Sequence, residues 1–215
     1  MAIMPKEQEN KEHIDFDLNE SVYISDKGRI ILHIINEENL KEFSFDGIKR
    51  RIGMHQETLS RNLNRLEDQH MVEKTANGYR ATARAKRSIL HLLDNTNNVS
   101  VHIPLIQTVL PQDIDCQQLL TSLRGRWFGR LRWLGYSEKK QKDDDDNDYC
   151  TSENTFKWIT DDGEIQVDAI FSNYVLNIEA KLLKNKKEIN DAIKVSHQLM
   201  RHIFRLYSMQ QGVKL

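Results

Sequence analysis

The chain has 215 residues, of which 39% are hydrophobic and 29% charged, and its formal net charge is −1. This length suits one large domain or two of roughly 100 residues each, and the composition excludes a chain that is disordered throughout. No apolar run approaches the ~18 residues of a membrane span, and the N-terminus has no apolar signal core. The two cysteines, Cys116 and Cys150, form no CxxC pair, which argues against a disulfide scaffold or a zinc site and favours a cytoplasmic protein.

The charge is distributed unevenly along the chain. Residues 41–90 contain 11 Lys or Arg against 6 Asp or Glu. Residues 1–20 contain 2 against 6, and residues 138–153 contain 3 against 7. A basic segment is usually solvated surface, so by itself it is weak evidence for a polyanionic partner.

The N-terminal part is predicted to be a disordered acidic tail over 1–20 followed by three helices. Ser25 is the expected N-cap of a helix over 26–42, in which the spacing of four isoleucines predicts one buried face (Ile30, Ile31, Ile34, Ile35). Ser44 can cap a short second helix, and Gly53 ends it as a glycine C-cap does. Leucines three and four residues apart predict a third helix over 56–69, whose apolar stripe packs on the second helix (Leu59, Leu63, Leu66).

The segment after the third helix has the pattern of a hairpin followed by a helix. Two short strands flank Asn77-Gly78, a pair typical of a tight turn, and residues 82–93 return to a helical pattern. The face of the third helix opposite its leucines is polar and cationic. An α-helix fits the DNA major groove, where Arg pairs with guanine and Asn or Gln with adenine.

The whole stretch from about residue 26 to 93 resembles the winged helix-turn-helix of MarR-like and ArsR-like transcription regulators. The resemblance is carried by a run of residues and by the wing that follows it, which has Asn77-Gly78 at its tip. The run consists of Gly53-Met54, Thr58-Leu59-Ser60-Arg61, Leu63, Leu66-Glu67 and Met71-Val72. It implies that the third helix enters the major groove and that the wing touches the flanking backbone or minor groove. The residues it places on double-stranded DNA are Gln56, Thr58, Ser60, Arg61, Asn64 and Arg65 on the helix, and Lys74 and Arg80 on the wing. His55 and His70 depart from the family pattern, which usually has a Ser or Thr cap and often a Gly there.

The C-terminal part, 98–215, is predicted to be a small antiparallel-sheet domain. Polar residues follow the first domain, 21–95, and a short strand begins near residue 99. A helix over 113–130, a strand over 130–139 and an acidic loop over 138–153 come next. Three strands and a long closing helix complete the chain (155–160, 164–171, 175–183 and about 186–209), with Asp162-Gly163 as a hairpin turn and Asn185 and Glu188 as a capping box. The predicted fold class is α+β.

One pattern in the C-terminal part resembles the PD-(D/E)xK nucleases. Asp168, Glu179 and Lys181 have the Asp, then Glu-x-Lys spacing of that motif. If the chain turns about Asn173-Tyr174, Asp168 lies opposite Glu179 and Gln166 opposite Lys181, and all four share a face. Facing carboxylates could hold a magnesium ion, and the lysine could help to activate water. The alternative is the solvated side of an ordinary amphipathic sheet, and this is the reading we expect.

Arginines alternate with aromatic residues over 124–136. The segment contains Arg124, Arg126, Arg130 and Arg132 among Trp127, Phe128 and Trp133. Such interleaving could bind a nucleic-acid backbone or stack on bases. We expect instead a junction whose aromatic side chains fill the core while the arginines cover them.

These patterns together predict a sequence-specific transcription regulator that acts by occupying promoter DNA, with no catalysis and no cofactor. A winged helix that binds only protein is an alternative to DNA binding. The closing helix has a wide apolar face, which favours a homodimer. No membrane contact is expected, and no phosphate loop, cysteine pair or histidine cluster identifies a small-molecule ligand.

Overall fold

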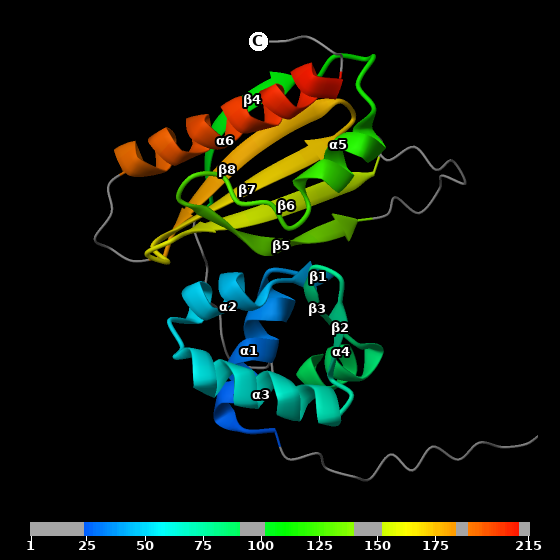
Figure 1. Ribbon diagram of the computed structural model, residues 1–215, viewed down its shortest axis with the longest axis vertical. Helices are drawn as coiled ribbons and strands as arrows, with labels where there is room; N and C mark the ends of the chain where they lie inside the picture. Colours follow the sequence, from blue (N-terminus) through cyan, green and yellow to red (C-terminus); the bar gives the residue numbers. More distant parts are fainter. Residues whose placement is uncertain (1–23, 91–101, 140–151, 184–188, 211–215) are drawn as a thin grey trace, which may run out of the picture.

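The structure, a computed structural model, describes residues 24–90, 102–139, 152–183 and 189–210 (Figure 1). The first part contains α1 (Asp26–Glu37), β1 (Glu42–Phe43), α2 (Phe45–Ile52), α3 (Gln56–Asp68), β2 (Val72–Thr75), β3 (Gly78–Ala81) and α4 (Ala83–Leu90). The second contains β4 (His102–Val109), α5 (Cys116–Leu123), β5 (Leu131–Lys139), β6 (Glu153–Thr160), β7 (Ile165–Ser172), β8 (Val175–Leu182) and α6 (Ile189–Gln210). The predicted α+β class is confirmed.

The predicted caps of the first helices are present. The Ser25 hydroxyl accepts a hydrogen bond from the Gly28 amide at 3.1 Å, and the Ser44 hydroxyl accepts one from the Gly47 amide at 2.9 Å. Gly53 ends α2 in the left-handed conformation, with φ of 70°. Each cap satisfies backbone groups that have no partner within the helix, which is why these three residues mark the helix ends.

All eight strands belong to one antiparallel sheet in the order β2-β3-β1-β5-β6-β7-β8-β4. The link between the two parts is β1, where Phe43 pairs with Tyr79 on one side and with Gly135 on the other. The sequence predicted helix rather than strand as far as residue 42. Because of β1, the hairpin β2–β3 and the C-terminal strands form a continuous sheet across the boundary predicted near residue 95.

The two faces of the sheet are covered by different helices (Figure 1). Helices α5 and α6 lie on one face, over a core rich in aromatic side chains (Trp133, Phe156, Trp158, Val167, Ile178, Leu199, Ile203). On the other face, α1, α2 and α3 form a second core that includes Leu134 and Ile159 from the sheet. The predicted leucine stripe of α3 is fully buried in this second core (Leu59, Leu63, Leu66).

Three predictions differ from the structure. Helix α1 ends at Glu37, and Ile30 is 46% exposed while Leu32 takes its place in the core. The helix predicted over 113–130 ends at Leu123, because Gly125 and Gly129 adopt left-handed backbone conformations. Cys116 is disulfide-bonded, which the cysteine usage did not predict.

Some predicted features cannot be compared with the structure. The tail over 1–20, residues 140–151 of the acidic loop and the capping box of Asn185 and Glu188 lie outside the described residues. Among those that are described, no helix combines the length and the apolarity needed to cross a membrane.

Candidate nucleic-acid interface

Helix α3 lies at the end of the molecule farthest from α6 (Figure 1). The polar side chains opposite its buried leucines are exposed or half-buried. Four of its predicted contact residues are exposed (Gln56, Arg61, Asn64, Arg65), and Thr58 and Ser60 are half-buried. Five of the six lie away from the buried leucine stripe, whereas Gln56, three positions before Leu59, is exposed at the start of the helix on the side of the stripe. The helix can therefore offer amide, hydroxyl and guanidinium groups to a partner without disturbing its packing.

A buried asparagine, which the sequence did not single out, holds α3 against α1. Asn62 is 6% exposed; its side-chain nitrogen donates to the Thr58 carbonyl at 2.7 Å. Its side-chain oxygen accepts a hydrogen bond from the Ser25 hydroxyl at 2.6 Å. The N-cap of α1 is thereby tied to the middle of α3, which restricts how α3 can rotate about its axis. The only signal in the sequence is a polar residue between two leucines of the buried stripe.

The hairpin β2–β3 places two more predicted cations on the surface, each with a carboxylate partner. Lys74 Nζ lies 2.9 Å from Glu67, and Arg80 Nε lies 2.5 Å from Glu73. The hydrogen bond and charge of Glu67 raise the pKa of Lys74, and Glu73 raises the pKa of Arg80 in the same way. Exposed ion pairs are weak because water screens them, so phosphate groups can compete for these cations.

The two arginines of the outer face of α3 differ in their partners. Arg61 lies 3.6 Å from Glu57 one turn earlier in the helix. Arg65 has no ion pair within the part of the chain that the structure describes. Of the predicted contacts, Arg65 is therefore the cation most available to an incoming anion.

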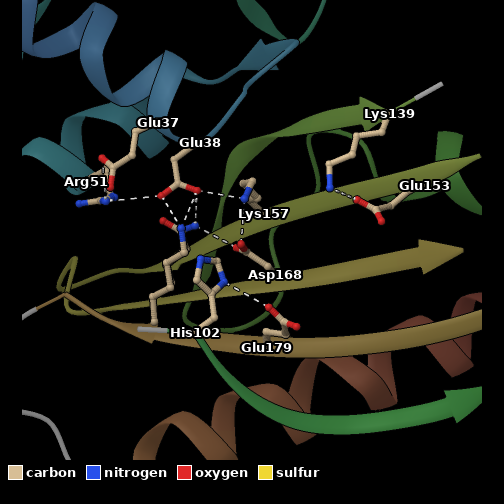
Figure 2. A network of polar contacts seen from close by, with 11 residues as sticks. Glu37, Glu38, Arg51, His102, Lys139, Glu153, Lys157, Asp168 and Glu179 are labelled. Atoms are coloured by element: carbon tan, nitrogen blue, oxygen red, sulfur yellow. Dashed lines mark hydrogen bonds and ion pairs between the residues drawn. The ribbon is translucent and has the colours of Figure 1, made fainter. Parts of the chain in front are cut away.

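Behind this surface, a buried ionic network joins the end of α1 to the sheet. Figure 2 shows Glu38 reaching from α1 toward Lys157 of β6. The Glu38 carboxylate accepts hydrogen bonds from Lys157 Nζ at 2.9 Å, from Gln166 Nε2 at 2.9 Å and from Lys181 Nζ at 2.9 and 3.0 Å. Asp168 accepts from Lys157 at 2.8 Å and from Gln166 at 2.9 Å. Two buried carboxylates thus face two ammonium groups, and the Arg51 guanidinium lies 3.4 Å from Glu38 and 3.7 Å from Glu37.

The strand register that places these residues together was predicted correctly. Asp168 pairs with Glu179 and Gln166 pairs with Lys181, about the turn at Asn173-Tyr174. The predicted solvation of this face was wrong. Asp168 and Lys181 are 2% and 4% exposed, because α1 and α2 cover this part of the sheet. The pattern of the strands shows which residues share a face but cannot show what covers it.

In the ionic network, Asp168 and Lys181, which a nuclease would need for metal binding and for activating water, are engaged in ion pairs and hydrogen bonds. Lys181 is bound to Glu38, and Asp168 is bound to Lys157 and Gln166. Glu179, opposite Asp168 in the strand register, is half-buried and lies 3.2 Å from Nδ1 of His102. Within the described residues, no three His, Cys, Asp or Glu side chains are grouped so as to hold a metal ion. A metal at Asp168 would require the ion pairs of this face to open.

No protein-family model, curated protein or solved structure matches this chain. The function is therefore inferred from the described residues alone.

We expect the Glu38→Gln variant to lose about 3–5 kcal/mol of unfolding free energy, because it leaves buried ammonium groups without their counter-charge. Urea denaturation at neutral pH measures the loss. The matched control is Glu37→Gln, since Glu37 is more exposed and lies 3.7 Å from Arg51. The control should lose less than about 1 kcal/mol. Equal losses in the two variants would contradict a special role for the buried carboxylate.

The same network predicts a dependence of stability on pH. Burial by itself raises the pKa of Glu38, but the charges of Lys157 and Lys181 and their hydrogen bonds bring it well below its ordinary value. A carboxylate with a lowered folded-state pKa stabilises the protein above its unfolded pKa of about 4.3 and loses that contribution as the pH falls further.

Below pH of about 4.3, the unfolding free energy of the wild type should therefore fall more steeply than that of Glu38→Gln, by up to about 1.4 kcal/mol per pH unit. Urea titrations of both proteins at several acidic pH values measure the difference. Parallel curves would show that Glu38 does not carry this dependence.

Proposed function

We propose that the chain is a sequence-specific DNA-binding transcription regulator that acts by occupying promoter DNA. In this proposal, α1 to α4 and the hairpin β2–β3 form a winged helix-turn-helix domain. The observation that carries the proposal is the outer face of α3, where Arg61, Asn64 and Arg65 are all exposed while the leucine stripe behind them is buried, with Gln56 exposed at the start of the helix.

The chemistry of these side chains fits base edges and phosphates. Asn64 and Gln56 can each form two hydrogen bonds to adenine, and Arg61 and Arg65 can do so to guanine. Lys74 and Arg80 on the hairpin would exchange their carboxylate partners for phosphate oxygens of the flanking backbone. The hydrogen bonds of Asn62 support this reading, because a helix that reads base edges needs a fixed orientation.

The Asn64→Ala and Arg65→Ala variants should each lose about 1–3 kcal/mol of binding free energy at a selected site and should discriminate less at the contacted base. Sites can be selected from a random-sequence duplex pool, and affinities measured by fluorescence anisotropy. The matched control is Lys194→Ala, which removes an exposed cation on α6 at the opposite end of the molecule. Its affinity should equal that of the wild type.

Arg80→Ala should instead weaken binding to all sequences alike, because a phosphate contact carries no base preference. If the wild type binds no duplex at low salt, the proposal is wrong and a protein-binding winged helix becomes the better reading. Cleavage of DNA in the presence of magnesium, lost in Asp168→Ala, would instead support the nuclease.

We further propose that the chain binds DNA as a homodimer through its C-terminal part. Helix α6 buries four apolar residues against the sheet (Ala192, Val195, Leu199, Ile203). Two apolar side chains near its ends remain exposed, Ile189 at 47% and Met209 at 66%. Light scattering should give about twice the 25.3 kDa mass of one chain. A monomer at micromolar concentration would contradict this.

A further inference from the structure

The loop between α5 and β5 exposes a large aromatic side chain. Trp127 is 58% exposed, whereas Trp133 and Trp158 are 1% and 0% exposed. The prediction that aromatic residues of this segment fill the core holds for Phe128 and Trp133 but is wrong for Trp127. Exposed tryptophans of this kind often mark interaction sites, since burying the large apolar surface of the indole contributes favourable binding free energy.

The loop backbone is anchored on both sides of Trp127. Trp158 Nε1 donates a hydrogen bond to the Arg126 carbonyl at 2.9 Å. Phe128 and Leu131 exchange two backbone hydrogen bonds of 2.9 Å, and the Phe128 ring is buried 5.1 Å from the ring of His202. An aromatic side chain presented on an anchored backbone loses little conformational freedom when a partner binds.

Cations surround the exposed indole. The guanidinium carbon of Arg132 lies 4.8 Å from the centre of the Trp127 ring, and Arg126 is exposed. Within the described residues, neither arginine has a carboxylate partner, although Arg132 donates to the Gly129 carbonyl at 2.6 Å. Arg130 differs, because Asp161 and Asp162 bind it at 3.1 and 2.7 Å. The patch therefore combines an aromatic face with two positive charges that have no carboxylate partner among the described residues.

The patch adjoins the proposed wing. A Cβ atom built on Gly125 would lie 3.4 Å from the side-chain oxygen of Asn77, so the start of the loop contacts the tip of the hairpin β2–β3. The same hairpin carries Lys74 and Arg80. The Arg126–Trp127 segment thus continues, on the sheet side, the surface that we assign to DNA.

We propose that Arg126, Trp127 and Arg132 form a second DNA contact beside the wing, in which the arginines bind phosphate oxygens and the indole packs on the flanking sugar-phosphate backbone. This inference rests on the proposed function. Continuity with the wing and the two cations without carboxylate partners favour DNA over a protein partner. The contact would add affinity without base preference.

Affinity and its salt dependence test the contact, with a mixed-sequence duplex of about 30 base pairs, roughly three turns of DNA. Arg126→Ala and Trp127→Ala should each weaken binding about three- to tenfold at about 50 mM salt. Arg126→Ala should also lower the slope of log affinity against log salt by about 0.9. Arg130→Ala is the matched control from the same loop, and it should bind like the wild type because two carboxylates, Asp161 and Asp162, hold its guanidinium. Arg80, by contrast, has the single ion-pair partner Glu73 within the described residues.

Fluorescence offers an independent measurement, since Trp127 is the exposed tryptophan of the three. Acrylamide should quench the free protein readily, and saturating duplex should protect it. Trp127→Phe should show little quenching with or without DNA. If acrylamide quenches the wild type in the complex as strongly as it quenches the free protein, the inference is wrong.

The outcomes separate this inference from the proposed function. If Arg65→Ala loses affinity while Arg126→Ala and Trp127→Ala bind like Arg130→Ala, the second contact is wrong and the regulator proposal stands. If the wild type binds no duplex, both are wrong. If light scattering gives Trp127→Ala half the mass of the wild type while its DNA affinity is unchanged, the patch is a subunit interface and not a DNA contact. Unchanged urea denaturation of each variant confirms that it is folded.

Discussion

The buried carboxylate of Glu38 is the interaction on which the arrangement of the two parts depends. It is 3% exposed and lies between two ammonium groups that come from β6 and β8. Glu38 is the C-cap of α1, directly after the last helical residue, before the chain turns toward β1. Burying four charges costs several kcal/mol each unless every charge is paired. A shift of α1 over the sheet would separate Glu38 from Lys157 and Lys181, so the network opposes other placements.

The short strand β1 enforces the same arrangement through the backbone. Strand β1 pairs with β3 of the hairpin on one side and with β5 on the other. Each of these strands has a glycine where it lies against β1, Gly78 in β3 and Gly135 in β5. A Cβ atom on Gly78 would lie 2.2 Å from the Phe43 carbonyl oxygen, and one on Gly135 would lie 2.2 Å from the Glu42 carbonyl oxygen. Side chains at these two positions would push the strands apart, so glycine is what permits a continuous sheet here.

A rigid junction of this kind has a consequence for DNA recognition. Helix α3 is held by Asn62 to α1, α1 is held by Glu38 to the sheet, and the sheet carries α6 on its other face. If α6 joins two subunits, the separation of their α3 helices is set by packed elements rather than by a linker. Half-site spacing on DNA would then follow from the dimer geometry.

Local features of this protein were predictable from its sequence because they depend on neighbouring residues. Ser25, Ser44 and Gly53 mark helix ends through bonds to groups a few positions away, and the alternation about Asn173-Tyr174 sets which residues of β7 and β8 face each other. The polar face of α3 follows from the spacing of its leucines in the same way.

The tertiary structure alone decided what covers each face. Glu38 is separated from Lys157 by 119 positions and from Lys181 by 143, and no periodicity relates residues that far apart. The face of Asp168 and Lys181 therefore reads as solvated in the sequence, yet it is buried once α1 lies on it. The reverse holds for Trp127, whose aromatic character suggests the core, although its anchored loop holds it in solvent. Burial is a property of distant contacts, and those contacts form only when the whole chain packs.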